Sequence, residues 1–266
     1  MLFTACGKED AVTTASNDSV ESAEEGLSAL PTEDIGSASA LVGDCLWINV
    51  FMHNEQCPWD EESKTAVKEM VTDAGNYITG QGKTYGAEVR FEYKWFDSDG
   101  SYPIPHYTSG ASYGVNNFKY SSYGGFDGYV NTLLEGAEPD NYFLMFHFNC
   151  HGRSFSVPCD AYVGEDSDYY SEFCVAFYSE KEDGDYFACP AVYAHEVLHC
   201  FGAADINAER LDGELNALAE EYFPDDIMRA VPESLEKCSI GNISAKLIGW
   251  KNDVPEGLED FLKKLS

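Results

Sequence analysis

The sequence predicts an α/β domain in which a mixed, mostly parallel sheet is backed by helices. Short apolar segments typical of buried strands alternate with longer segments in which apolar residues recur at helical spacing. Their order is strand, helix, strand, helix, strand and then a further helix, which favours parallel pairing with helical crossovers. Hydrophobic residues make up 44% of the 266 residues, which is enough for a core of this kind.

The first forty residues differ from the rest in composition. Serine, alanine, threonine and acidic residues dominate 7–40, and large apolar side chains are almost absent. Such a segment cannot bury enough surface to offset the entropy lost on ordering. We therefore expect a disordered acidic tether over 1–40 and one folded domain over 41–266.

Three elements open the domain. Residues 43–52 are apolar on both alternations, which predicts a buried strand. After Pro58, Asp60 can cap a helix whose apolar residues keep helical spacing as far as Gly80. Residues 87–96 alternate apolar and charged side chains, which predicts a half-buried strand.

The remaining elements follow from the same two periodicities. Helical spacing predicts helices over 126–134, 208–222 and 242–250. Apolar runs at 141–149 and 172–179 predict two more strands, the first of them central in the sheet. His147 and His151 lie in extended chain, about 13 Å apart, too far to bind one metal, so we interpret both as structural.

Residues 194–205, AHEVLHCFGAAD, form a motif with a chemical role for each fixed position. On a helix, His195 and His199 lie on one face and can bind a single Zn²⁺. Glu196, beside them, can accept a proton from a metal-activated water and pass it to a leaving amine. Gly202 allows the chain to turn back, which can bring Asp205 to the metal as an oxygen ligand.

This HExxHxxGxxD pattern resembles the extended signature of the metzincin clan of zinc metallopeptidases, over roughly 41–266. The resemblance implies a zincin fold with an N-terminal lobe at about 41–202. It also implies a small, mostly helical C-terminal lobe at about 203–266, with a tight turn that places a methionine beneath the metal. Met228, in the segment FPDDIMR, is the candidate for this Met-turn.

Two further features follow from the metzincin resemblance. An antiparallel edge strand would line the cleft and pair with extended substrate, and we place it between His151 and Val163. Some families carry a tyrosine two residues after the methionine, where this chain has Ala230. The group that stabilises the oxyanion is therefore not identified.

A rival for the third ligand lies further along the chain. In thermolysin-like zinc peptidases this ligand is a glutamate on a second helix, and Glu220 and Glu221 lie at about the corresponding distance. We prefer Asp205, because Gly202 gives it a turn on which to approach the metal.

Nine cysteines are many for a reducing compartment, and none form a CxxC pair. Cys6, in LFTACG, resembles the lipidated cysteine at the end of a bacterial lipoprotein signal whose start would lie upstream. This implies an extracellular or cell-surface protein anchored by lipid. The other cysteines permit four disulfides, and we expect the pairs Cys45–Cys57, Cys150–Cys159, Cys174–Cys189 and Cys200–Cys238.

Charge and loop composition limit the partners. A net charge of −31 argues against nucleic-acid binding, and no run of 18 apolar residues is present to span a bilayer. The tyrosine-rich loop over 97–125 is either a rim that selects substrate or a surface insertion. Its DSDG fragment at 97–100 resembles part of a calcium loop but lacks the distal Glu, so calcium is a minor candidate beside the single zinc ion.

Together these observations predict a monomeric zinc endopeptidase that acts on extracellular proteins or peptides and touches membrane only through Cys6. An alternative is a surface lipoprotein that binds a protein or glycan and keeps a vestigial metal site. A small-molecule amidase using the same metal chemistry is a third interpretation. Zinc content and cleavage of an unstructured protein separate these readings.

Overall fold

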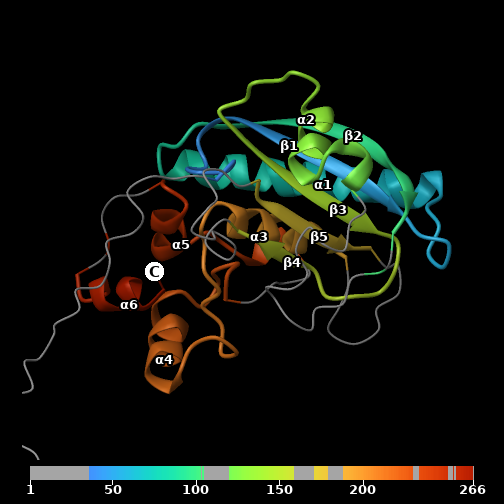
Figure 1. Cartoon of the computed structure of the whole chain (residues 1–266). Coiled ribbons are helices and arrows are strands. Elements are labelled where there is room, and N and C mark those ends of the chain that lie inside the picture. The colour runs from blue at the N-terminus through green and yellow to red at the C-terminus, as the bar shows by residue number, and fades with distance from the viewer. Residues whose placement is uncertain are drawn as a thin grey trace, which may run out of the picture. The chain divides into compact units, whose positions relative to one another are not determined.

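A five-stranded sheet is the frame of the protein (Figure 1). The computed structural model describes residues 36–102, 104, 120–158, 171–178, 188–229, 234–250, 254 and 256–265, all within the unit formed by 33–266. Cys6, residues 1–35 of the predicted tether, most of the tyrosine-rich loop, Cys159 and Ala230 lie outside the described residues.

The strands are arranged in the order β2-β1-β3-β5-β4, with β3 in the centre. All neighbours pair in parallel except β4 and β5, which are antiparallel. The predicted mixed, mostly parallel sheet is confirmed, and the antiparallel edge strand lies within 151–163. The strand bounds are β1 Gly43–His53, β2 Val89–Ser101, β3 Asn141–Phe148, β4 Phe155–Val157 and β5 Phe173–Phe177.

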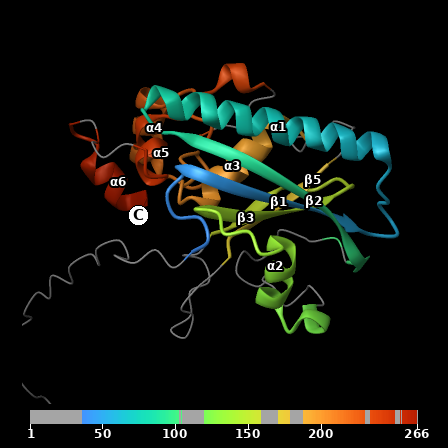
Figure 2. The same ribbon diagram turned by 90° about the horizontal axis from the view of Figure 1, so that it is seen from above.

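Helices cover both faces of the sheet: α1 and α3 lie on one side and α2 on the other (Figure 2). The predicted helices are present, although α1 extends beyond Gly80 to Thr84 and α4 begins only where Asp212 caps it by accepting from the Leu215 N–H. The short helix α6 was not predicted. The helix bounds are α1 Glu61–Thr84, α2 Phe126–Leu134, α3 Pro190–Cys200, α4 Gly213–Tyr222, α5 Asn242–Leu247 and α6 Glu259–Leu265.

The apolar character of β1 on both alternations has a direct structural cause. Cys45, Trp47 and Phe51 point into the core shared with α1 and α3. Leu46 and Ile48, on the opposite face, point into a second core shared with α2. A central strand covered on both faces needs apolar residues at every position, as observed.

Asp60 caps α1 as predicted, since its carboxylate accepts from the Ser63 N–H at 2.7 Å. His147 is also structural, as predicted. It is fully buried on β3, and its Nε2 lies 2.9 Å from the Asn49 Oδ1. Burial lowers the pKa of His147 to about 3, so the ring is neutral.

The expected disulfides are wrong for the described cysteines, all of which are free. Cys45 opens β1 and Cys57 follows its end, so an extended strand of about 3.3 Å per residue separates them. The Cys200 thiol lies 3.3 Å from that of Cys174, not beside Cys238 as predicted. The correct neighbour could not be identified because strand and helix directions decide it, not spacing.

The described ends of the tyrosine-rich loop converge on one carboxylate. Tyr102 and Tyr123 donate to the two oxygens of Asp99 at 2.9 and 2.7 Å. Asp97 pairs with Lys64 at 2.5 Å. Both acidic side chains of the DSDG fragment therefore have partners within the protein.

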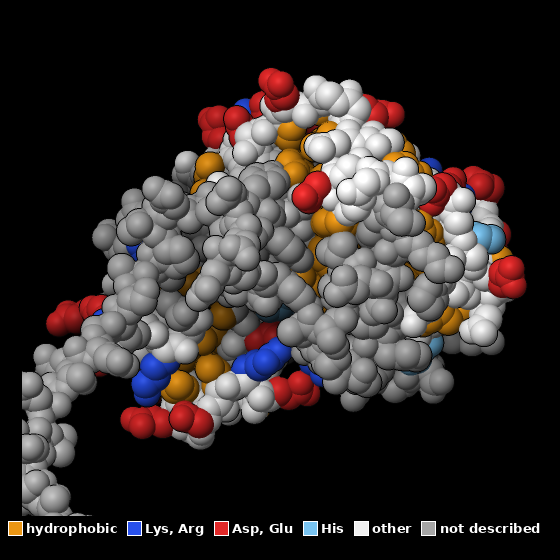
Figure 3. Space-filling view, viewed as in Figure 1, with side chains coloured by type: hydrophobic (Ala, Val, Ile, Leu, Met, Phe, Trp, Pro, Cys, Tyr) orange, Lys and Arg blue, Asp and Glu red, His pale blue; other side chains and the backbone are white. Residues whose placement is uncertain are grey.

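The surface is strongly acidic. Carboxylates are spread around the rim of the face shown in Figure 3, with few basic side chains among them, consistent with the net charge of −31. None of the helices in the described part of the chain combines the length and apolar character needed to cross a membrane.

A buried carboxylate ties the segment before β1 to the start of β5. The Glu172 Oε2 accepts from the Ser37 N–H at 2.7 Å, the Ser37 hydroxyl at 2.6 Å and the Ala38 N–H at 3.0 Å. Burial raises the pKa of Glu172 to about 7, although these donors oppose the rise.

This contact predicts a loss of stability as pH rises. The folded-state pKa of Glu172 exceeds its ordinary value of 4.5. The protonated side chain therefore contributes fully to the free energy of unfolding below pH 4.5, and this contribution is lost as pH rises through 7. We expect the difference in unfolding free energy between wild type and Glu172→Gln to fall by up to about 3 kcal/mol between pH 4.5 and pH 7. Urea denaturation at a series of pH values measures it; a constant difference would contradict the prediction.

Candidate metal centre

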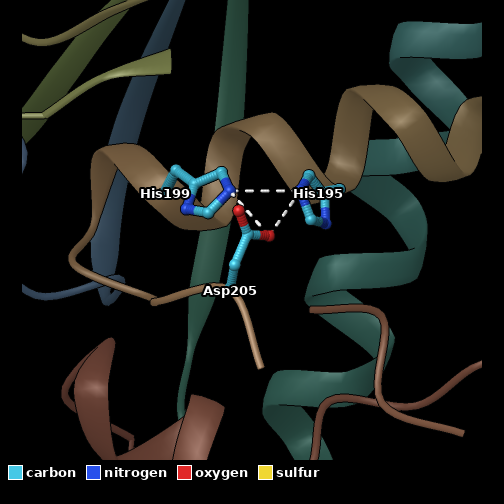
Figure 4. A group of neighbouring side chains, drawn as sticks. All are labelled: His195, His199 and Asp205. Atoms are coloured by element: carbon cyan, nitrogen blue, oxygen red, sulfur yellow. Dashed lines mark hydrogen bonds and ion pairs between the residues drawn. The ribbon is translucent and has the colours of Figure 1, made fainter. Parts of the chain in front are cut away.

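Helix α3 presents the motif from a rigid position between α1 and the strands β4 and β5. It begins with Cys189 as its N-cap and Pro190 in its first turn, where proline costs no backbone hydrogen bond. Val197, Leu198 and most other residues of the helix are buried. His195 and His199, one turn apart, point from the helix toward Asp205 on the chain below it (Figure 4).

The three side chains bring one donor atom each to a common point. The two Nε2 atoms lie 3.1 Å apart, and the Asp205 Oδ1 lies 3.4 Å from that of His195 and 3.5 Å from that of His199. A tetrahedral ion with bonds of about 2.0–2.1 Å would separate its ligand atoms by about 3.3 Å. The triangle therefore has the size that such an ion requires.

Backbone carbonyls fix which nitrogen of each histidine faces this point. The Nδ1 of His195 lies 3.0 Å from the Ile227 carbonyl oxygen, and that of His199 lies 2.7 Å from the Ala203 carbonyl oxygen. Because a carbonyl only accepts, both Nδ1 atoms must donate. In the neutral rings the Nε2 atoms then carry lone pairs, the arrangement by which metal-binding histidines are oriented.

Gly202 ends α3 with the turn that was predicted for it. Its φ is +91°, its N–H donates to the His199 carbonyl at 3.0 Å, and the Ala203 N–H donates to that of Leu198 at 3.0 Å. These two bonds with a left-handed residue define a Schellman turn. The same turn places the Ala203 carbonyl against His199 and directs the chain to Asp205.

Asp205 is held close to the histidines with an oxygen left free for a cation. Its Oδ1 is buried and has no hydrogen-bond partner among the described residues. The Oδ2 lies 3.7 Å from the Arg210 Nε. Burial raises the pKa of Asp205, but His195 and His199 together outweigh burial and hold the pKa well below its usual range, so the carboxyl is ionised.

The rival ligands lie elsewhere. Glu220 pairs with Arg229 at 3.7 Å and its side chain is 70% exposed, and Glu221 is exposed on the same helix. In the described part of the chain, His195, His199 and Asp205 are the His/Cys/Asp/Glu side chains that converge closely enough to hold a metal.

The loop with Met228 packs directly against this group. Met228 is fully buried, and its carbonyl accepts from the Ile206 N–H, next to Asp205, at 3.0 Å. The preceding residue, Ile227, supplies the carbonyl that orients His195. A Met-turn function for Met228 stays a prediction, but its loop supports two of the three candidate ligands.

Asp226, which sequence reasoning did not single out, fixes that loop. Its carboxylate accepts from the Met228 N–H at 2.8 Å, the Gly241 N–H at 2.9 Å and the Ser244 hydroxyl at 2.9 Å. The bond to Met228, two residues ahead, is an Asx turn, which an aspartate in FPDDIMR could have suggested. The other two contacts join distant segments and leave no local signal.

Glu196 points toward β4, not into the ligand triangle. It is buried, and the Ser156 hydroxyl lies 2.6 Å from its Oε2. Ser156 was not predicted either, because it lies forty residues away along the chain. Glu196 is not among the converging ligands, and its role as the general base stays a prediction.

The donor set fits a bound metal ion such as zinc. Two imidazole nitrogens and one carboxylate oxygen form a three-ligand set that leaves a fourth, open position in tetrahedral geometry. Two imidazole nitrogens and an ionised carboxylate oxygen, 3.1–3.5 Å from one another, can each offer an electron pair to a cation between them. The unpartnered Asp205 Oδ1 is the atom that such an ion would satisfy.

Comparison with known proteins finds similarity to solved structures. No family model matches the chain, and no curated protein matches it. Among solved structures, the chain is similar to metalloproteinase-II from Bacteroides fragilis, with a TM-score of 0.40 and 10% sequence identity. The similarity covers 82% of this chain and 54% of the other, so the chain spans about half its length. We base the assignment of the site on its own geometry.

We predict that Asp205→Ala weakens zinc binding more than about 100-fold, because loss of a ligand should exceed the effect of losing an outer contact. Glu220→Ala and Glu221→Ala, as matched controls, should bind zinc as wild type does. Isothermal titration calorimetry with the apo proteins measures all three. A wild-type zinc affinity in Asp205→Ala would show that Asp205 is not a metal ligand.

Gly202→Ala should reduce both zinc affinity and stability. A side chain at a φ of +91° costs about 1–2 kcal/mol, and relief of this strain moves the Ala203 carbonyl and Asp205. We expect about tenfold weaker zinc binding and a lower melting temperature, measured by calorimetry. Gly213→Ala is the control, since Gly213 has open space around its Cβ position and no positive φ; equal losses in both variants would refute the role of the turn.

Proposed function

We propose that the protein is a zinc-dependent endopeptidase that hydrolyses peptide bonds of extracellular proteins. The observation that carries this proposal is the convergence of the His195, His199 and Asp205 donor atoms, with both imidazoles oriented by backbone carbonyls. A purely structural zinc site is closed by four protein ligands, whereas the described residues bring three together here. The open position favours catalysis.

Zinc, held by His195, His199 and Asp205, would polarise the scissile carbonyl and make a water more acidic. Glu196 is the residue that moves the proton. Its carboxylate accepts a proton from the attacking water and then donates it to the nitrogen of the leaving amine. Because Glu196 is buried and hydrogen-bonded, its side chain is already ordered before substrate binds.

The edge of the sheet supports a polypeptide as substrate. Strand β4 ends the order of the described strands and lies against α3, so its outer backbone edge is next to the site. An extended peptide can add to such an edge through main-chain hydrogen bonds, which fixes its direction with little demand on side chains. This supports an endopeptidase over a small-molecule amidase.

The competing interpretation, a binding protein with a vestigial metal site, makes a different prediction. A binding protein of this kind need not hold one zinc ion per chain, and it need not cleave a peptide substrate. Zinc content by elemental analysis, with digestion of an unstructured protein before and after chelation, separates the two functions. Cleavage that stops on chelation and returns with zinc supports the peptidase; zinc-loaded protein without cleavage supports the binding function.

Glu196→Gln should keep one zinc ion and lower the cleavage rate at least about 100-fold, because a general base contributes about 10²–10⁴ in rate. Glutamine has the shape of glutamate but cannot accept the proton. The kcat/KM on a peptide library and the zinc content of the same sample measure both effects. A variant with undiminished activity would exclude Glu196 as the base.

A further inference from the structure

We propose that Ser156 is a positioning residue for Glu196, a role that rests on the proposed peptidase function. Ser156 lies in β4, and its hydroxyl reaches across to the middle of α3. It is the hydrogen-bond donor that the structure gives to the Glu196 carboxylate among the described residues. The edge strand would then have two roles, one through its backbone and one through this side chain.

The direction of the Ser156 side chain follows from the strand pattern. Its neighbours Phe155 and Val157 are buried in the core on the α2 side of the sheet. Alternation along a strand therefore turns Ser156 to the other face, where α3 lies. Pairing with Cys174 of β5 fixes its register along the helix.

The hydroxyl has three acceptors within reach but only one proton. Its oxygen lies 2.6 Å from the Glu196 Oε2, 2.8 Å from the carbonyl oxygen of the same residue and 3.3 Å from the Cys174 Sγ, which is a weak acceptor. The Cys174 thiol also donates to this carbonyl, at 3.3 Å. Because the carbonyl has that further donor and a hydrogen bond to a carboxylate is stronger, the proton of Ser156 goes to the carboxylate.

A base held by one oxygen has its other oxygen free for water and the leaving amine. A glutamate side chain has three rotatable bonds, and among the described residues the Ser156 bond is the one that holds the Glu196 carboxylate in one position. Displacement of a catalytic group by about 1 Å can cost on the order of 100-fold in rate. Ser156 thus acts on the rate of the chemical step and not on substrate binding.

Ser154 offers a matched comparison on the same segment. Its hydroxyl accepts from the Phe177 N–H at 3.1 Å, which ties the chain before β4 to the end of β5. Ser154 and Ser156 are both partly buried serines whose hydroxyls make polar contacts within the sheet region. Only Ser156 contacts Glu196.

The test compares Ser156→Ala, Ser156→Thr and Ser154→Ala in the full chain with zinc bound. For Ser156→Ala we expect kcat on a peptide substrate to fall about 10–100-fold, with KM and zinc content changed less than about twofold. Ser156→Thr keeps the hydroxyl and should recover most of the rate. Ser154→Ala should match wild type. Crystal structures of the zinc-loaded variants should show the Glu196 carboxylate displaced or in several conformations in Ser156→Ala alone.

Two results would overturn the proposal. One is a Ser156→Ala variant with wild-type kcat, or one whose loss is matched by Ser154→Ala or not recovered by Ser156→Thr. The other is an unchanged Glu196 conformation in its crystal structure. If wild type with zinc cleaves no peptide, the peptidase function fails by itself, and the crystal structures still decide whether Ser156 holds Glu196.

Discussion

The convergence of three electron-pair donors is the constraint around which this protein is built. Two imidazole nitrogens and one carboxylate oxygen lie within 3.5 Å of one another, close enough to share one cation. The chain keeps them there with neutral backbone groups. The carbonyls of Ala203 and Ile227 turn the rings, and Gly202 turns the main chain toward Asp205.

The sheet makes this arrangement stiff. Both faces of β1 and β3 are covered. Helices α1 and α3 pack on one face, and α2 packs on the other. Helix α3 is buried along most of its length, so its histidines cannot separate by bending of the helix. The edge strand β4 adds Ser156 from the side of the sheet, which places Glu196, the candidate ligands and the edge strand on one frame.

Sequence patterns predicted the features that depend on residues close together in the chain. Periodicity identified the strands and most helices, and spacing alone predicted that His195, His199 and Asp205 could meet, because a helical turn and one glycine bring them together. Contacts between distant segments left no such pattern. Ser156 and Asp226 reach their partners only through strand order and loop closure. The expected disulfides were wrong for the same reason, since proximity of Cys200 to Cys174 depends on how β5 and α3 pack.

The hydrogen bonds that Asp226 makes to Met228, Gly241 and Ser244 link the metal site to the folding of a distant part of the chain. The three candidate ligands lie within eleven residues of sequence, so they can approach one another as soon as α3 and its turn form. The carbonyl that selects the tautomer of His195 comes from Ile227, in a loop held by Asp226 to Gly241 and Ser244. A nascent or partly folded chain therefore carries all its ligands before it can bind metal well. Tight metal binding is therefore coupled to closure of this loop against α3.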